Sequence, residues 1–295
     1  MPLRGLNDIL TYRHCTIMYK PEEKSMRAYY REKTYICGDY MDVQIFPVYA
    51  KAGVRRSKAK PTSETQARYN EQNSKRHFTR LVHTNFRPGD IALHLTYSDD
   101  YLPETEEQAR ADVQKFLRRL RRLYRAAENE LKYIWVCEKG EKRGRVHHHL
   151  ILNAGLSRDV IETLWEKGYA NSKRLKFGKN GVSGLTHYMT KQTLFFRRWN
   201  ASKNLLRPIE KTNDYRISGK KAAEMVEFAD DSELFEKLYP GYEYSECYAR
   251  GNEINGGKYI YLQLVRKQTN YMQKGFHNGQ SEQTPRKSSA KTDSL

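Results

Sequence analysis

Three consecutive histidines, His147 to His149, are the residues of this 295-residue sequence best placed to do chemistry. They belong to an apolar run that follows Gly144, a pattern typical of a β-strand. Alternate residues of a strand share a face, so His147 and His149 should point one way, and His148 the other way with the leucines that follow. Two neutral imidazoles on one rigid face form half of a divalent-metal site. The alternative for this stretch alone is a histidine-rich surface strand that binds no metal.

Glu138 is the candidate third ligand, at the end of a strand predicted over residues 131–138. Residues 139–144 should form a turn, and antiparallel pairing across it would bring Glu138 opposite residues 145–147. One carboxylate and two imidazoles leave coordination positions open for water and a phosphate oxygen, which suits Mg²⁺ or Mn²⁺. Zn²⁺ also accepts these ligands, although a structural zinc site would require a fourth protein ligand. An exposed turn carboxylate is the alternative for Glu138 taken alone.

Tyr188 and Lys191 lie in a segment that we predict to be helical from Leu185 to about Leu194. Residues three apart on a helix share a face. A phenol with a pKa near 10 is a poor nucleophile at neutral pH. It becomes useful where a metal polarises the phosphate and a nearby ammonium stabilises the developing charge. Because the chain holds 22 tyrosines, this pair alone has little weight.

The charge of the chain indicates a polyanionic partner, of which nucleic acid is the best match. Lys and Arg number 53 against 35 Asp and Glu, for a formal charge of +18, and tyrosines are abundant for stacking. A merely basic protein without such a partner is the alternative. The candidate contacts to a DNA backbone lie on helices predicted at 64–83 and 103–130, and they are Lys75, Arg76, Arg118, Arg122 and Arg125. The helix at 64–83 is equally typical of a solvated surface helix.

Cysteine usage and hydropathy indicate a cytoplasmic protein. The four cysteines are isolated in the sequence, so neither a disulfide framework nor a thiolate zinc site is indicated. No apolar run approaches the roughly 18 residues that a membrane span requires. The N-terminus lacks the apolar segment of a secretory signal. We therefore expect no membrane partner.

The predicted elements between residues 90 and 195 follow the order strand, helix, strand, strand, helix, strand, helix. This order predicts an α+β fold of the ferredoxin or RRM-like type, with an antiparallel sheet and helices packed on one face. Extensions precede and follow it, including a hairpin within residues 33–49. The predicted division is a basic N-terminal region over 1–84, the α+β domain over 85–197, a C-terminal α/β region over 198–268 and a disordered basic tail over 269–295.

The order of these motifs resembles that of the HUH (His-hydrophobe-His) endonucleases. More narrowly, it is similar to the rolling-circle replication initiators of small single-stranded DNA phages and related plasmids. Three motifs match in order over roughly residues 85–195: a Leu-Thr-Tyr strand at 93–97, the metal motif at 146–152, and Tyr188 with Lys191 as the nucleophile motif. Glu138 stands where the family often has a third metal ligand. Two departures are the extra His148 in the middle of the metal motif and the absence of a second tyrosine in 189–199.

The resemblance implies a metal-dependent enzyme that nicks and rejoins single-stranded DNA at a replication origin. Tyr188 would form a 5′-phosphotyrosine, and Lys191 would stabilise charge or orient the phosphate. The sequence has no phosphate-binding loop, so DNA unwinding would need a host helicase, and the freed 3′-OH would prime a host DNA polymerase in the bacterial cytoplasm. With one tyrosine, closure of a circle requires a second protomer or another nucleophile.

Three alternatives stay open at the level of sequence. A single-tyrosine transposase or relaxase would share the chemistry. A non-catalytic RRM-like module would bind nucleic acid through exposed aromatic side chains on its central strands, without metal. A metal-dependent nuclease that hydrolyses with water would leave no covalent link between protein and DNA.

Overall fold

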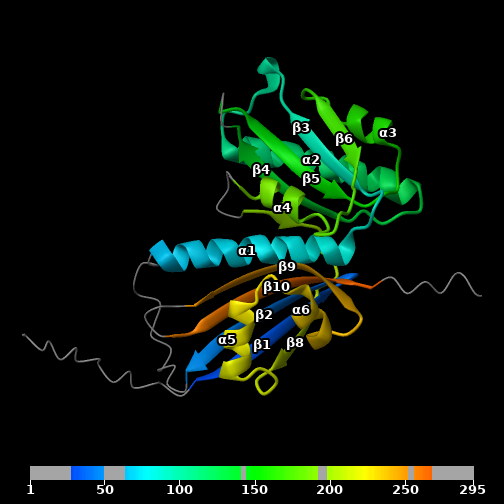
Figure 1. Cartoon of the computed structure of the whole chain (residues 1–295). Helices are drawn as coiled ribbons and strands as arrows, with labels where there is room; N and C mark the ends of the chain where they lie inside the picture. The colour runs from blue at the N-terminus through cyan, green and yellow to red at the C-terminus, as the bar shows by residue number, and fades with distance from the viewer. Residues whose placement is uncertain (1–27, 50–63, 141–143, 192–197, 252–255, 268–295) are drawn as a thin grey trace, which may run out of the picture.

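The computed structural model describes residues 28–49, 64–140, 144–191, 198–251 and 256–267. Two five-stranded antiparallel sheets and several helices make an α+β structure, as the sequence predicts (Figure 1). The basic segment 51–60, the tail 269–295 and the predicted helical residues 192–194 lie outside the described residues.

The first sheet has the strand order β6-β3-β5-β4-β7. Its strands are β3 (Ile91–Thr96), β4 (Tyr133–Lys139), β5 (Val146–Leu152), β6 (Ala170–Arg174) and β7 (Asn200–Ala201). Between them lie the 3-10 helix η1 (Asp99–Tyr101), α2 (Glu106–Ala126), α3 (Arg158–Thr163) and α4 (Ser183–Met189). Helices α2 and α3 connect strands that lie on either side of an inserted antiparallel strand, which is the split β-α-β arrangement of ferredoxin-like folds.

Helix α2 covers one face of this sheet. Thr105 caps it by accepting a hydrogen bond from the backbone N–H of Gln108. Its buried side chains recur at helical spacing and are Ala109, Val113, Phe116, Leu117, Leu120 and Tyr124. All of them except Ala109 share a core with Ile161 of α3 and with the sheet residues that point toward the helices. Helix α2 therefore leaves the opposite face of the sheet uncovered.

The second sheet combines the two ends of the described chain. Its order is β8-β1-β2-β10-β9, formed by β1 (Ala28–Cys37), β2 (Tyr40–Tyr49), β8 (Ile209–Asn213), β9 (Tyr242–Gly251) and β10 (Lys258–Arg266). Helices α5 (Gly219–Glu227) and α6 (Ser232–Leu238) contribute Met225 and Phe235 to its core. Ile45 of β2 pairs directly with Ile260 of β10. The N-terminal hairpin and the C-terminal strands, which are far apart in the sequence, thus belong to one sheet.

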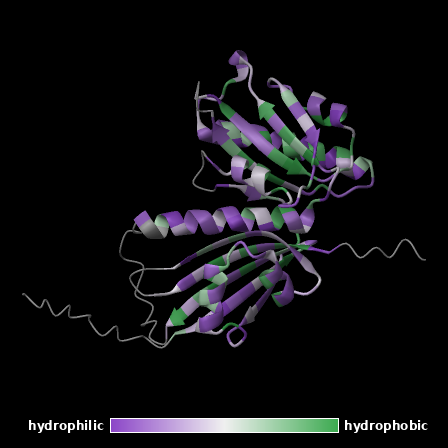
Figure 2. Cartoon of the chain, in the orientation of Figure 1, coloured by the Kyte–Doolittle hydropathy of each residue, from purple (hydrophilic) through white to green (hydrophobic). Residues whose placement is uncertain are grey.

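Helix α1 (Glu64–Asn85) runs between the two sheets (Figure 1). Most of its surface is hydrophilic (Figure 2), but Phe78, Val82 and, just after the helix, Phe86 are fully buried against the first sheet and α4. On its other side, Arg80 forms a buried ion pair with Asp42 of β2, at 2.9 Å. One helix therefore holds both sheets in place.

Candidate active site

The pairing of strand β5 with its two neighbours gathers four ligand-type side chains on one face of the first sheet. His149 pairs with His94 of β3, and His147 pairs with Glu138 of β4. Directly opposed residues of antiparallel strands point to the same side of a sheet. The four side chains therefore lie on the face opposite to α2.

Three of the four form a compact group, because the ring nitrogens of His94, His147 and His149 lie within 4.8 Å of one another. Oε2 of Glu138 is 3.3 Å from Nε2 of His147 and 3.3 Å from Nε2 of His149. Nε2 of His149 and Oε1 of Glu138 are buried and make no hydrogen bond with the described residues. Buried polar atoms normally have a partner, and a divalent cation would satisfy both. The donor set therefore fits a metal ion.

The pKa shifts in this cluster favour the protonation states that metal binding requires. Burial, with the neighbouring His149 and His147, lowers the pKa of His94 to about 4. Burial of Glu138 opposes its ionisation, but the close contacts of His147 and His149, each 3.3 Å from Oε2, outweigh burial and lower the pKa of Glu138 below the ordinary value. A neutral imidazole and an ionised carboxylate are the metal-binding forms of these side chains.

His148 lies on the other face, against the helices, as the strand alternation predicts. Its side chain is fully buried, and its Nε2 is 2.9 Å from the hydroxyl of Tyr97. Rings of Trp135 and Trp165 stand edge-on to it. Burial lowers the pKa of His148 to about 3, so the side chain is neutral. This histidine belongs to the core. The sheet separates it from the four ligand-type side chains on the other face, which we call the metal-type cluster: His94, Glu138, His147 and His149.

Tyr188 stands beside the cluster. Its ring lies edge-on to the ring of His149, with 5.4 Å between the centroids, and its side chain is 58% exposed. Helix α4 presents it outward because Thr186 and Met189 are buried on the inner side of the same helix. Thr186 is held by a 2.7 Å hydrogen bond to Thr79 of α1. The geometry gives an accessible phenol next to a candidate metal centre.

Lys191 lies just beyond α4, which is shorter than the sequence predicts. The helix ends at Met189, where the Thr190 hydroxyl donates to the carbonyl of Thr186. Such side-chain bonds to the preceding turn compete with helix continuation. The N–H of Lys191 donates to the Tyr188 carbonyl at 3.2 Å, so its backbone remains next to the tyrosine.

A pocket of 320 Å³ opens beside His94 and His149. Edge strand β6 lines it with Asn171 and Lys173, and Tyr169 just before the strand completes that wall. Asn171 pairs directly with His94, so it shares the face of the metal-type cluster. Tyr169 is 64% exposed. The pocket thus offers an aromatic ring, an amide and an ammonium next to the proposed nucleophile.

The chain from β3 to α4 matches a known family. The model of the family "Replication-associated protein ORF2/G2P" matches residues 90–193. No curated protein and no solved structure gives a significant match to the chain. The family match supports a role in replication initiation, and it covers every residue of the cluster as well as Tyr188.

The five cations predicted to contact DNA lie on α1 and α2, and none of them belongs to the cluster or lines the pocket beside His94. Arg118, Arg122 and Arg125 are exposed on α2, which packs against the opposite face of the sheet. On α1, Lys75 forms an ion pair with Glu71, and the guanidinium of Arg76 lies 4.1 Å from the ring centre of Tyr261. The structure does not bring these cations together around Tyr188. None of the described helices is long and apolar enough to cross a membrane.

His94 is the member of the cluster that sequence reasoning missed. It stands in the segment Leu93-His94-Leu95, where a lone histidine alternates with buried leucines. The alternation alone shows that His94 points away from the leucine face. That His94 pairs with His149 follows only from the register of β3 against β5, two strands that are far apart in the sequence.

Proposed function

We propose that the protein initiates rolling-circle replication by nicking and rejoining single-stranded DNA at an origin, with Tyr188 as the nucleophile. The observation that carries this proposal is the position of the exposed Tyr188 ring, 5.4 Å from the ring of His149 in the metal-type cluster. The family match over residues 90–193 supports the same conclusion. The origin DNA, a host helicase, a host polymerase and the bacterial cytoplasm are the partners and location that this role requires.

In the proposed reaction, the Tyr188 oxygen attacks the scissile phosphorus and the bond from phosphorus to the 3′ oxygen breaks. The phenol loses its proton to solvent, and the departing 3′ oxygen gains one and becomes a 3′-OH. The number of phosphoester bonds is unchanged, so a later 3′-OH can reverse the step without ATP. A divalent cation held by His94, His147, His149 and Glu138 would polarise the phosphate. Lys191 would add positive charge near the developing oxyanion.

The donor set favours Mn²⁺ over Mg²⁺. The sequence predicts two imidazoles and a carboxylate, whereas the addition of His94 gives three nitrogen ligands. Mg²⁺ prefers oxygen ligands and keeps several waters. Imidazole ligands suit transition metals better than they suit Mg²⁺, and Mn²⁺ is a transition metal that also suits carboxylate and water ligands.

Two alternatives receive less support from the arrangement of the described residues. An RRM-like binding module would need exposed aromatic side chains on the central strands, but β3 and β5 present imidazoles there. A nuclease that hydrolyses with water would not need the phenol that α4 places beside the cluster. A transposase or relaxase uses the same chemistry, and the family match favours the initiator.

The proposal is tested by capture of a covalent adduct. The full-length protein is incubated with Mn²⁺ and a single-stranded DNA library of randomised sequence, and denaturing electrophoresis then separates linked from free protein. We expect a peptide–nucleotide adduct on Tyr188 by mass spectrometry, with no adduct in Tyr188→Phe. Tyr215→Phe is the matched control, because Tyr215 is 96% exposed and lies next to the second sheet. An adduct that persists in Tyr188→Phe, or none in the wild type, overturns the proposal.

A further inference from the structure

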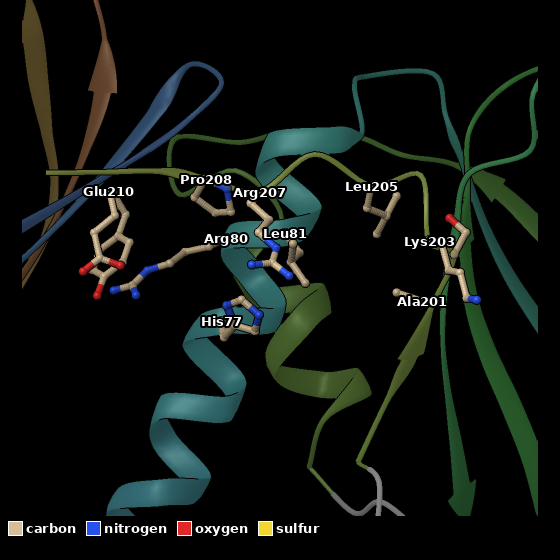
Figure 3. Close-up of a pocket in the computed structure, with 11 residues that line it drawn as sticks. His77, Arg80, Leu81, Ala201, Lys203, Leu205, Arg207, Pro208 and Glu210 are labelled. Carbon is tan, nitrogen blue, oxygen red and sulfur yellow. The ribbon is translucent and has the colours of Figure 1, made fainter.

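A second and larger pocket, of 560 Å³, lies between the two sheets. It is formed by α1, by Tyr35 of β1, and by the segment from Ala201 to Glu210 that crosses from the first sheet to the second (Figure 3). Its size is within the range of pockets that bind nucleotide-sized ligands. The pocket belongs to neither the metal-type cluster nor the pocket beside His94.

The charges that line this pocket are mostly basic. In Figure 3 the guanidinium of Arg207 lies near the centre of the pocket, that of Arg80 extends toward Glu210, and Lys203 lies toward the first sheet. The one carboxylate of the wall, Glu210, is already paired with Lys33 at 2.6 Å. Lys203 and Arg207 form no ion pair with the described residues. The pocket therefore has two cations whose charge is not balanced locally.

Arg80 gives a second and independent sign of a ligand. Its side chain is only 7% exposed, its Nε donates to Asp42, and its guanidinium lies 3.5 Å from the ring centre of Tyr35. Its Nη2 nevertheless has no hydrogen-bond partner among the described residues. Leaving a buried N–H of a charged group unpaired is costly. An oxygen acceptor bound in the pocket would remove that cost.

His77 reports on the same basic environment. Partial burial, followed by the charges of Arg80 and Arg207, lowers its pKa below the ordinary value. The imidazole is therefore neutral near pH 7, and its ring packs against Trp199 with 5.6 Å between centroids. A neutral ring in a basic pocket is suited to stack on a base while the cations hold a phosphate.

We propose that this pocket binds a phosphodiester unit of the single-stranded DNA, held by Lys203, Arg207 and the free Nη2 of Arg80. DNA is the favoured source of the phosphate because one wall of the pocket, the segment from Ala201 to Glu210, follows α4 in the sequence. The segment that lines it follows β7, which pairs with the same strand, β4, that carries Glu138. A strand leaving Tyr188 could thus continue toward the second sheet. The inference rests on the proposed function in taking single-stranded DNA as the ligand. It does not depend on cleavage of that DNA.

The test is a binding measurement in the Tyr188→Phe background, where the DNA is not cleaved. Affinity for a fluorescent oligothymidylate is measured against salt concentration for Lys203→Gln with Arg207→Gln. The matched control is Lys211→Gln with Lys220→Gln, which removes the same charge from exposed positions outside the pocket wall. Each phosphate contact adds about 0.7 to the slope of log affinity against log salt for single strands, so the pocket variant should lose about 1.4.

The arms of the experiment separate the outcomes. A larger loss of slope in the pocket variant than in the control supports the proposal. Thymidine monophosphate is the second probe: if its binding, and not that of the oligomer, depends on the pocket, the phosphate comes from a free nucleotide and the DNA assignment is overturned. Equal losses in the pocket and control variants overturn the pocket altogether. Formation of the covalent adduct is measured separately, in the protein that keeps Tyr188. A failure of the catalytic proposal can therefore be told apart from a failure of the pocket proposal.

Discussion

The ring of Tyr188 stands edge-on to the ring of His149, with 5.4 Å between centroids, although one residue comes from α4 and the other from β5. The helix reaches this position through Thr186, whose hydroxyl bonds to Thr79 of α1 at 2.7 Å. The N-terminal helix therefore takes part in placing the proposed nucleophile over the proposed metal ligands.

Mn²⁺ should raise the thermal midpoint of the wild-type protein, and His147→Ala and His149→Ala should remove that increase. A ligand that binds only the folded state adds about 2.7 kcal/mol of stability when its concentration is 100 times its Kd. His187→Ala is the control, because His187 is exposed on α4 outside the cluster. Calorimetry with Mn²⁺ and with Mg²⁺ checks the result. A full Mn²⁺ shift retained by His147→Ala would contradict the assignment of the centre.

His94→Ala should weaken Mn²⁺ binding more than Mg²⁺ binding. The substitution removes a nitrogen ligand and leaves Glu138, and nitrogen ligands matter more to Mn²⁺ than to Mg²⁺. The measurement is a titration of both ions by isothermal calorimetry. Equal affinities of wild type and His94→Ala for Mn²⁺ would show that His94 only packs beside the centre.

The sequence predicts those parts of the site that depend on pairing between strands adjacent in the chain. Glu138 and His147 face each other because few residues separate their two strands in the sequence, and such hairpins can be predicted from the order of residues alone. His94 joins the cluster through β3, which is distant in sequence, and its register depends on tertiary packing. For the same reason, the sequence does not predict the pairing of β2 with β10. The early end of α4 coincides with the bond from the Thr190 hydroxyl to the Thr186 carbonyl, a local contact that helix propensity does not reveal.

Tyr169→Ala should weaken the binding of single-stranded DNA without affecting the binding of Mn²⁺. The Tyr169 ring is 64% exposed and lines the 320 Å³ pocket beside His94, where it can stack on a base. Alanine substitution of a stacking residue costs about 1–3 kcal/mol per base. Fluorescence anisotropy in the Tyr188→Phe background gives the affinity, with Tyr215→Ala as the control. The same small loss in both variants would mean that Tyr169 is a surface residue without a role in binding.

The stability of the protein should fall as the pH drops from about 6.5 toward 4, in part because of His83. Burial lowers the pKa of His83 to about 4 from its ordinary value of 6.5. Between these values the unfolded chain binds a proton at His83 and the folded chain does not, so protonation favours unfolding. The full effect below the lower pKa is about 3 kcal/mol. Above pH 6.5 His83 adds no pH dependence.

His83→Gln should therefore flatten the acid limb of the stability profile, whatever it does to stability at neutral pH. Urea unfolding over the interval from pH 6.5 to 4 measures the slope. His187→Gln is the matched control, since His187 is exposed on α4. If the slopes of His83→Gln and wild type coincide, folding does not lower the pKa of His83 and the prediction is wrong.

Gly168→Ala should destabilise the protein and weaken DNA binding together, because Gly168 packs the approach to β6 against β3. A Cβ at Gly168 would lie 2.4 Å from the Thr96 carbonyl oxygen and 2.5 Å from the Ser98 nitrogen, both of them backbone atoms that cannot move aside easily. The φ of +154° adds strain for any other residue, so we expect a loss above about 1 kcal/mol. The N–H of Thr96 donates to the carbonyl of Tyr169, the residue after Gly168, at 2.8 Å, so the clash also displaces the stacking ring.

Gly184→Ala is the opposite control. A Cβ at Gly184 would meet no atom within 4 Å, and alanine in α4 should stabilise the protein by about 0.5–1 kcal/mol. Urea unfolding of both variants measures these changes, and a Gly168→Ala protein as stable as the wild type would show that the loop before β6 can shift without cost.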